Sequence, residues 1–247
     1  SYFAGLASAG LKDYQGAAAW LDKVGAESPL AGRAALAAAR AWGDAGDYEK
    51  AVAALRGQAT GIPQPEGDLL LATALEQTGA AADAAFHAQR VYYGYPASKE
   101  AAEAERLLAR LRERLGGDYP PPLPEAMLGR AARWLAAGNH ARARREYEEL
   151  ATQLGGAERD LARVRTGAAR YEGGGAEAAL RYLEDLRVET AEADAERLYY
   201  LVQCARRLDR PDAMRGYLDE LQAKHAASDW RMGALVWAGN YYLLKND

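Results

Sequence analysis

The feature that most constrains this chain is an internal repeat. A small or apolar residue recurs just after each expected turn between helices, at Ala17, Ala51, Ala84, Ala143, Ala179 and Met214. Successive marks are 34, 33, 59, 36 and 35 residues apart. Four of these five intervals share nearly one period, so the chain is expected to consist of repeated supersecondary units.

The residues four and seven positions after each mark are apolar in all cases but one, Gln58. A stripe at i, i+4 and i+7 is one face of an amphipathic helix. A period near 34 residues is typical of tetratricopeptide repeats, which are helix–turn–helix units. We therefore predict an all-α, tetratricopeptide-like α-solenoid, a right-handed superhelix of antiparallel helix pairs with about 13–14 helices. First helices are expected to line its inner groove.

Helix ends are predicted from glycine, proline and capping residues. Tyr95-Pro96 breaks one helix, and Ser98 is a good N-cap for the next. Glycines such as Gly46, Gly79 and Gly138 follow other helices, where a left-handed cap costs glycine nothing. The first helices of the pairs are predicted at 2–11, 31–44, 66–77, 125–137, 157–171, 191–207 and 229–244. An additional helix is predicted at 98–115, within the long interval of 59 residues.

The segment 116–124, GGDYPPPLP, is too rich in glycine and proline to be helical throughout. It predicts a linker between an N-terminal solenoid at 1–115 and a C-terminal solenoid at 125–247. The last predicted helix carries two tryptophans and two tyrosines, which do not suit the polar cap of a finished solenoid. We expect that the natural protein continues past Asp247 into a further domain.

Composition excludes several classes of function. The formal charge of −4 gives no overall attraction to nucleic acid, so we predict no nucleic-acid partner. No apolar run is long enough to span a membrane. One cysteine allows no internal disulfide, and Cys204 lies on an apolar stripe, where a core role is expected. We expect a monomer.

No catalytic or metal-binding pattern stands out. The histidines His87, His140 and His225 are far apart in sequence and lack partners at metal-ligand spacing. The run 173–175, Gly-Gly-Gly, precedes a helix but has no preceding strand, so a turn is expected rather than an anion cradle. We predict no catalytic residue, no metal and no cofactor.

Two features favour binding. Residues 121–170 hold nine Lys or Arg against six acids, which predicts either a mild anion-binding patch or a solvated face with i,i+4 ion pairs. Three Tyr-Tyr pairs, at 92–93, 199–200 and 241–242, are expected to place one ring of each in the core and one toward the groove. The predicted binding residues are Arg130, Arg133, Arg163, Arg170, Tyr199 and Tyr241.

Three segments carry a resemblance to a known family. The run 92–111, from Tyr92-Tyr93-Gly94-Tyr95-Pro96 to Leu111, together with 69–75, LLLATAL, resembles the early helical repeats of soluble lytic murein transglycosylases. The run 237–243, WAGNYYL, resembles the stretch where that family's helical domain continues toward its catalytic part. In that family, a glutamate of a Glu-Ser pair in the catalytic domain acts as acid and base. In this chain the Glu27-Ser28 pair is followed by Pro29 and lacks a downstream Gly-Leu-Met-Gln stretch, so no catalytic role is assigned to Glu27.

The resemblance implies a periplasmic, non-catalytic scaffold of a peptidoglycan lytic transglycosylase, whose full-length parent holds the enzyme activity. Its partners would be peptidoglycan glycan strands or proteins, and the arginines at 130–133 and 163–170 would meet muramyl peptide carboxylates. The alternative is a free-standing tetratricopeptide adaptor that binds a peptide or helix of a partner protein in its groove. A hydrolase active within this chain is a third hypothesis, which no motif supports.

Overall fold

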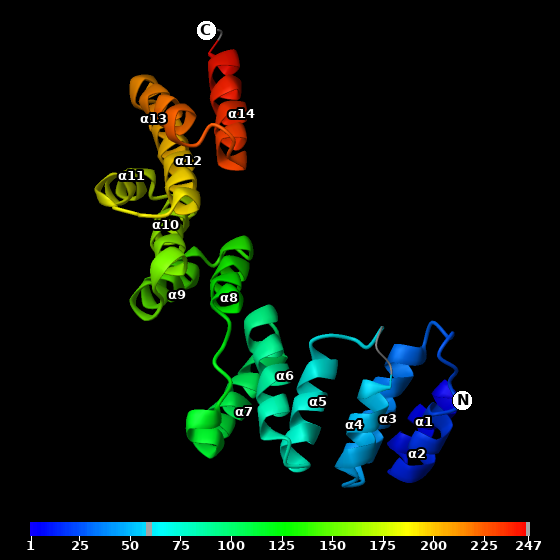
Figure 1. The fold of residues 1–247 in the computed structure, drawn as a ribbon. Helices are drawn as coiled ribbons and strands as arrows, with labels where there is room; N and C mark the ends of the chain where they lie inside the picture. The colour runs from blue at the N-terminus through cyan, green and yellow to red at the C-terminus, as the bar shows by residue number, and fades with distance from the viewer. Residues whose placement is uncertain (58–60, 246–247) are drawn as a thin grey trace. The chain divides into compact units, whose positions relative to one another are not determined.

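The computed structural model of the protein describes residues 1–57 and 61–245. Over those residues it contains fourteen α-helices, one short 3-10 helix and no β-strand (Figure 1). The all-α class and the predicted helix count are thereby confirmed. The chain divides into two compact units, Ser1–Pro122 and Leu123–Asp247, hereafter unit 1 and unit 2.

The two units share one plan over the described residues, three helix pairs followed by a single helix. Unit 1 contains α1 (Tyr2–Gly10), α2 (Tyr14–Leu21), α3 (Ala31–Asp44), α4 (Tyr48–Arg56), α5 (Glu66–Gln77), α6 (Ala81–Gly94) and α7 (Lys99–Leu115). Unit 2 contains α8 (Pro124–Ala136), α9 (His140–Gln153), α10 (Gly156–Glu172), α11 (Ala176–Asp185), α12 (Ala191–Arg207), α13 (Pro211–Lys224) and α14 (Asp229–Leu244).

Local chemistry explains where several helices begin and end. The side chain of Ser98 accepts a hydrogen bond from the amide of Ala101 and caps α7, as predicted. The side chains of Asp47 and Asn139 cap α4 and α9 in the same way. Gly46 and Gly138 follow first helices with positive φ, a conformation that costs glycine little. The predicted bounds of the first helices agree with the observed ones to within one residue.

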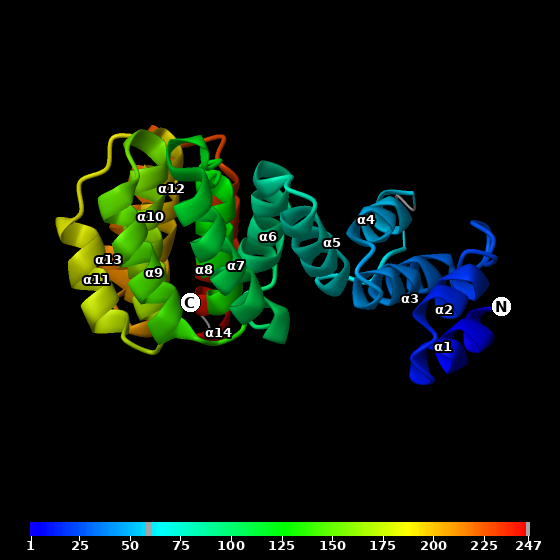
Figure 2. The same ribbon diagram turned by 90° about the horizontal axis from the view of Figure 1, so that it is seen from below.

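The helices of each unit alternate between two layers. Each first helix packs on the next first helix, as α8 does on α10, α10 on α12 and α12 on α14. Each second helix packs between two first helices, and successive second helices make at most marginal contact over the described residues. Figures 1 and 2 show α9, α11 and α13 along one side of unit 2. This is the packing of a tetratricopeptide-like solenoid.

The long 59-residue interval in the repeat has a structural explanation. Helix α7 packs on α5 and α6, so it occupies the position of a first helix whose second helix is missing. The next pair then starts anew at α8. The sequence predicted an additional helix at 98–115, and the structure shows that this helix, α7, takes the position of a first helix.

The repeat marks are core positions. The six marks found in the sequence, Ala17, Ala51, Ala84, Ala143, Ala179 and Met214, are all fully buried. The residues four positions later are buried or partly buried. Gln58, the polar exception in the stripe, lies outside the described residues. The sequence Lys245-Asn246-Asp247 predicts a turn into a second helix, and its last two residues also lie outside the described residues.

Two glycines set the closest approach of paired helices. A Cβ built on Gly5 would lie 2.5 Å from Cγ of Leu21, and one built on Gly167 would lie 2.4 Å from Cδ2 of Leu183. Leu21 and Leu183 occupy the same repeat position, four residues after a mark. Each unit therefore uses a glycine of a first helix to receive a leucine of its second helix.

The repeat spacing of the sequence predicts core positions for most of the five tryptophans, and the structure departs from this expectation. Trp134 is buried, and Trp42 and Trp230 are partly buried. Trp20 and Trp237 are each 44% exposed, so that expectation is wrong for these two. Cations lie over both exposed rings, Lys23 over Trp20 and Arg206 over Trp237. Cations also lie over the less exposed rings of Trp42 and Trp134, so this contact is common to four of the tryptophans.

The segment between the units contains a short 3-10 turn, η1 (Gly116–Asp118), and then non-helical backbone up to Pro124, the first residue of α8. Gln89 of α6 donates a hydrogen bond to the carbonyl of Pro120 at 2.8 Å, which ties this segment to unit 1. The division of the chain into one solenoid at 1–115 and another at 125–247 stays a prediction.

In the described residues no helix has the length and apolar character needed to cross a membrane.

Candidate functional site

The gaps between successive second helices are the main hollows that we find in the described residues. The α2–α4 gap holds about 190 Å³ and the α4–α6 gap about 430 Å³. In unit 2 the α9–α11 gap holds two hollows of about 460 and 480 Å³, and the α11–α13 gap one of about 470 Å³. The floor of each gap is the intervening first helix. These hollows lie on the second-helix side, not on the layer of first helices that the sequence led us to expect as the groove.

The α9–α11 gap is distinguished by its arginines, and we call it the arginine groove. Its two hollows share α10 as floor and have α9 and α11 as walls. The residues that line it are Gly138, Asn139, His140, Ala141, Arg144, Glu148 and Ala151 of or just before α9, Arg159, Arg163, Thr166, Ala169, Arg170 and Gly173 of or just after α10, and Gly175, Ala178 and Tyr182 of or just before α11.

The sequence of α10 explains this lining. Arg159, Arg163 and Arg170 stand at i, i+4 and i+11, which places them along one face of a helix. Between them lies Thr166, which is buried and donates its hydroxyl to the carbonyl of Ala162 at 3.0 Å. Because the floor residues between the arginines are small, the gap stays open there.

The part of the groove around Arg170 is organised by Glu148, which lines one hollow and pairs with two arginines of the other. Its Oε1 accepts a hydrogen bond from Nη2 of Arg170 at 3.2 Å, and Nε of Arg144 lies 3.7 Å from the same oxygen. The guanidinium of Arg170 also lies over the ring of Tyr182, 4.5 Å from its centroid. Burial raises the pKa of the Tyr182 hydroxyl, although Arg170 and Arg163 oppose this rise. Tyr182 thus remains neutral and holds Arg170 in place.

The part of the groove around Arg159 and Arg163 is organised by Asp160, which is 1% exposed. Its Oδ2 accepts hydrogen bonds from the amides of Glu189 and Thr190 at 2.8 and 3.2 Å, which ties α10 to the start of α12. Its Oδ1 lies 4.0 Å from Nε of Arg159 and 3.8 Å from Nη1 of Arg163.

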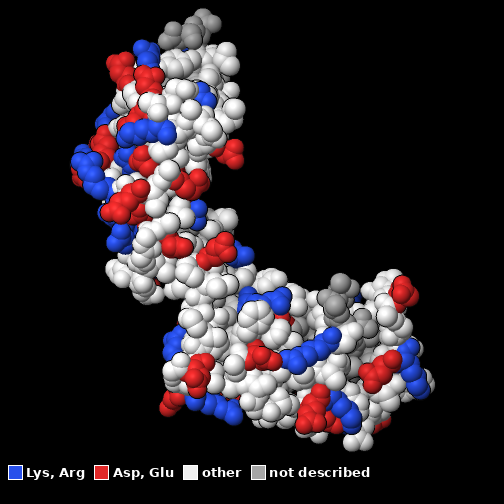
Figure 3. Space-filling model, in the orientation of Figure 1, with Lys and Arg blue, Asp and Glu red and all other residues white. Residues whose placement is uncertain are grey.

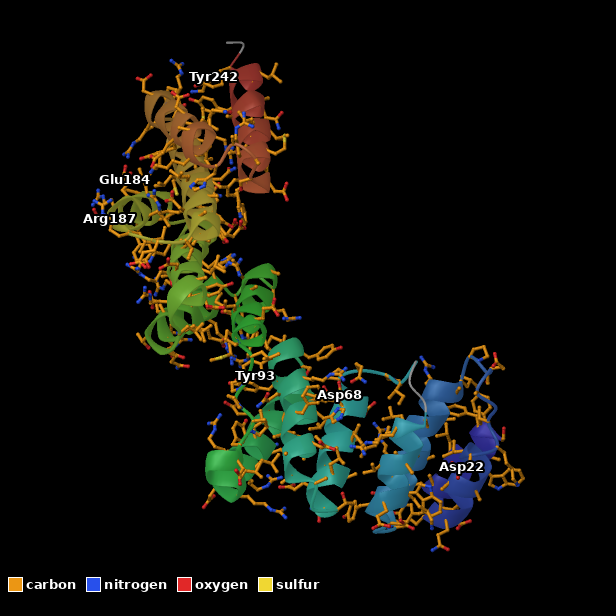
Figure 4. The ribbon with its side chains drawn as sticks, in the orientation of Figure 1. Asp22, Asp68, Tyr93, Glu184, Arg187 and Tyr242 are labelled. Carbon is orange, nitrogen blue, oxygen red and sulfur yellow. The ribbon has the colours of Figure 1, made fainter. Side chains whose placement is uncertain are left out.

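Two arginines of the groove have donors without acceptors. Nε of Arg159 and Nε of Arg170 are buried and have no hydrogen-bond partner in the described part of the chain. Arg163, by contrast, donates from Nη1 to the carbonyl of Arg187 at 2.8 Å. Arg187 is labelled in Figure 4, beside the end of α11. A buried donor that lacks an acceptor is costly, so these two groups favour an incoming acceptor.

The structure brings two of the six predicted binding residues together, Arg163 and Arg170. Arg130 is buried in α8 and donates to Oε1 of Glu146 at 2.5 Å, which makes it part of the interior. Arg133 is exposed on α8, with its Nη1 over Gly129. The sequence prediction missed Arg144, Arg159 and Tyr182. The spacing of 159, 163 and 170 on one helix face is the signal that could have found Arg159.

The two predicted tyrosines lie elsewhere in unit 2. Tyr199 of α12 packs its ring 5.1 Å from that of Tyr200 and 5.2 Å from that of Trp230. Tyr241 of α14 donates its hydroxyl to Asp209, which also pairs with Lys245. Both rings therefore serve contacts within unit 2, and their binding role stays a prediction.

Charges elsewhere are mostly interleaved. Figure 3 shows acidic and basic side chains intermixed over both units on the face in view. A largely buried ion pair joins α10 to α12. Arg165, whose side chain is 29% exposed, donates to both carboxylate oxygens of the buried Glu196. Burial raises the pKa of Glu196, and the hydrogen bonds and charge of Arg165 oppose this rise.

The residues that could carry chemistry are held in structural roles. Cys204 is fully buried, and burial raises the pKa of its thiol to about 12, so it is a poor nucleophile. The ring of His87 pairs with Asp68, labelled in Figure 4, and that of His225 with Asp194, each at 2.9 Å. No group of three or more metal-ligating side chains occurs among the residues described.

Comparison with known proteins adds little to this picture. No family model matches the chain, and no curated protein matches it. Two solved structures align with 98% of the chain: the TPR domain of P58(IPK), at 14% identity and TM-score 0.39, and the TPR2AB domain of yeast Sti1 in a complex with pHSP90, at 13% identity and TM-score 0.38. The alignment covers 64% of the first and 95% of the second. At this level of similarity the fold rests on the helix packing itself. The resemblance to lytic murein transglycosylases gains no support.

Proposed function

We propose that this chain is a non-catalytic helical-repeat adaptor that binds an extended segment of a partner protein in the arginine groove. The observation that carries the proposal is the groove itself, an open gap with a floor of small residues and four arginines along it. Grooves between packed helices are a common mode of peptide recognition.

The dimensions suit an extended chain. From Arg159 to Gly173 the floor helix advances about 21 Å at 1.5 Å per residue. An extended segment covers that length with about six residues at 3.3 Å each. The walls of α9 and α11 would bury the segment on two sides, while its backbone would remain partly open to water.

The scaffold of a periplasmic lytic transglycosylase remains the finer alternative that the sequence resemblance implies. Its glycan partner and its location have no support from the comparisons, and no contact in the groove favours a sugar over a peptide. Peptidoglycan binding is therefore one of the outcomes that the experiment below can detect.

The test is selection from a random twelve-residue peptide display library on the whole chain, with soluble peptidoglycan fragments as a second probe. Ala178→Trp and Ala151→Trp would fill the groove without changing its charge, and Ala223→Trp on the exposed face of α13 is the matched control. We expect selected peptides to lose binding to the filled variants and to keep binding to the control.

Two outcomes would overturn the proposal. One is a set of selected peptides that bind the filled variants as well as the natural chain. The other is the absence of any selected peptide together with saturable binding of peptidoglycan fragments that the filled variants retain.

A further inference from the structure

The geometry points to an acidic occupant: we infer that the segment bound in the arginine groove carries two carboxylate side chains, four or six residues apart and so on the same side, with neutral residues between them. This inference rests on the proposed function, because it names the chemistry of the partner at the same site. It assigns the first carboxylate to Arg159 and the second to Arg170.

The charge balance of the groove favours a negative ligand. Four guanidinium groups face only two carboxylates, those of Glu148 and Asp160. The excess of positive charge is local, since the chain as a whole has a formal charge of −4. A positively charged groove on a chain with negative net charge favours negatively charged segments and guides their approach.

The two arginines with unpartnered donors are the natural anchors. Arg159 and Arg170 keep 40% and 30% of their side chains exposed, while the Nε of each is buried without an acceptor. A carboxylate can accept from Nε and one Nη of the same guanidinium in a side-on pair. A turn of each guanidinium that brings its Nε edge toward the groove would satisfy its unpartnered donor, and for Arg170 the incoming carboxylate would take over the contact now made with Glu148.

The spacing follows from the helix. Arg159 and Arg170 are eleven positions apart, which is about 16 Å along α10. In an extended segment alternate side chains face the same side, so residues four or six apart are about 13 or 20 Å apart. Both distances lie within the reach of long arginine side chains, whereas adjacent acidic residues point to opposite sides and cannot meet both anchors.

Glu148 explains why the middle of the segment is neutral. Its carboxylate lies between the two hollows, where Arg170 and Arg144 hold it. A ligand with a negative charge at every unit, such as a nucleic-acid backbone, would place one charge against Glu148. A segment with separated acidic residues avoids that repulsion, so Glu148 discriminates between these ligands.

The experiment measures fluorescence anisotropy of labelled twelve-residue peptides with the whole chain. One peptide carries two glutamates four residues apart in a Ser/Ala background, a second has glutamines instead, and a third has adjacent glutamates. We expect the first to bind most tightly, with affinity that falls as salt rises. Arg159→Gln and Arg170→Gln should each weaken its binding about tenfold, as expected for the loss of a charged hydrogen-bonded contact.

Two further variants keep the result interpretable. Arg145→Gln, an exposed arginine of α9 outside the groove lining, should leave binding unchanged. Arg159→Lys preserves charge but not the planar fork, so it should give an intermediate loss even if Arg159→Gln disturbs the fold. Glu148→Gln should strengthen binding of the peptide with adjacent glutamates more than that of the spaced peptide.

The inference is overturned if the glutamine peptide binds as tightly as the acidic one, or if oligouridylate binds more tightly with the same dependence on Arg159 and Arg170. Its failure is distinct from that of the proposed function. If non-acidic peptides from the display selection are lost on Ala178→Trp, the adaptor stands and only the acidic specificity falls.

Discussion

The α2–α4 gap of unit 1 and the α9–α11 gap of unit 2 occupy equivalent places in the same packing plan. The first is lined largely by alanines, including Ala31, Ala34, Ala35, Ala53 and Ala54, and holds about 190 Å³. The second is lined by four arginines and holds hollows of about 460 and 480 Å³. The solenoid plan therefore provides a gap in each unit, and the lining side chains decide whether it becomes a site.

The interiors of the two units differ in the same sense. The buried residues described in unit 1 include many alanines and no aromatic ring, and Asp68 is the one buried charge among them. Unit 2 buries Trp134, Tyr147 and Tyr171 and the charged groups of Arg130, Asp160 and Glu196. Helices that meet on small side chains approach closely, whereas larger ones are held further apart. We infer that unit 2 depends on polar partners where unit 1 depends on close packing.

The strongest test of this difference is Glu196→Ala. Removal of this buried carboxylate leaves Arg165 without its partner between α10 and α12, so we expect a loss of about 3–5 kcal/mol in the free energy of unfolding. The counterpart in unit 1 is Asp83→Ala, which removes an exposed pair with Arg56 and should cost less than about 1 kcal/mol. Urea denaturation followed by far-UV circular dichroism measures both. Equal losses would remove the distinction between the units.

A smaller effect is expected where the units are alike. Gly167→Ala and Gly5→Ala each force a leucine of the paired helix to move, and we expect losses of about 1–3 kcal/mol for overpacking. Gly216→Ala in α13 is the control, because nothing lies within 4 Å of the added Cβ. It should gain up to about 1 kcal/mol from helix propensity. A stability gain in Gly167→Ala would show that the glycine–leucine contact is not a packing constraint.

The third prediction concerns acid stability of unit 2. Burial alone would raise the pKa of Asp194, but hydrogen bonds from His225 and Arg197 outweigh it and lower that pKa below 3.8. A depressed pKa in the folded state stabilises the fold above the unfolded-state pKa. That stabilisation is lost as pH falls through the folded-state pKa, over roughly pH 5 to 2.

Asp194→Asn should therefore lower stability at pH 7 and flatten its decline at acidic pH, as measured by urea midpoints at a series of pH values. Asp185→Asn, at an exposed position near the end of α11, is the matched control. An acid profile for Asp194→Asn that runs parallel to that of the natural chain would contradict the prediction.

Much of the fold followed from sequence because local signals agreed with each other. The marks at Ala17, Ala51 and Ala84 in unit 1, like those in unit 2, predicted buried positions and proved fully buried. Glycine and proline positions predicted the helix ends to within one residue in the first helices. Trp20 and Trp237 were misjudged because repeat spacing assigns a residue to a face of its helix but does not show how much of a large ring the neighbouring helices cover.

The sequence by itself determined the repeat, the helices and the stripe of residues that forms the core, because each depends on spacing within about 34 residues. It also named Arg163 and Arg170. Only the tertiary structure decided that α7 takes the place of a first helix, that Arg130 is interior, and that Arg144, Arg159 and Tyr182 join those two arginines across three helices. The physical reason is that a gap between second helices exists only once the first helices have packed together, and no spacing within one helix reveals what faces it.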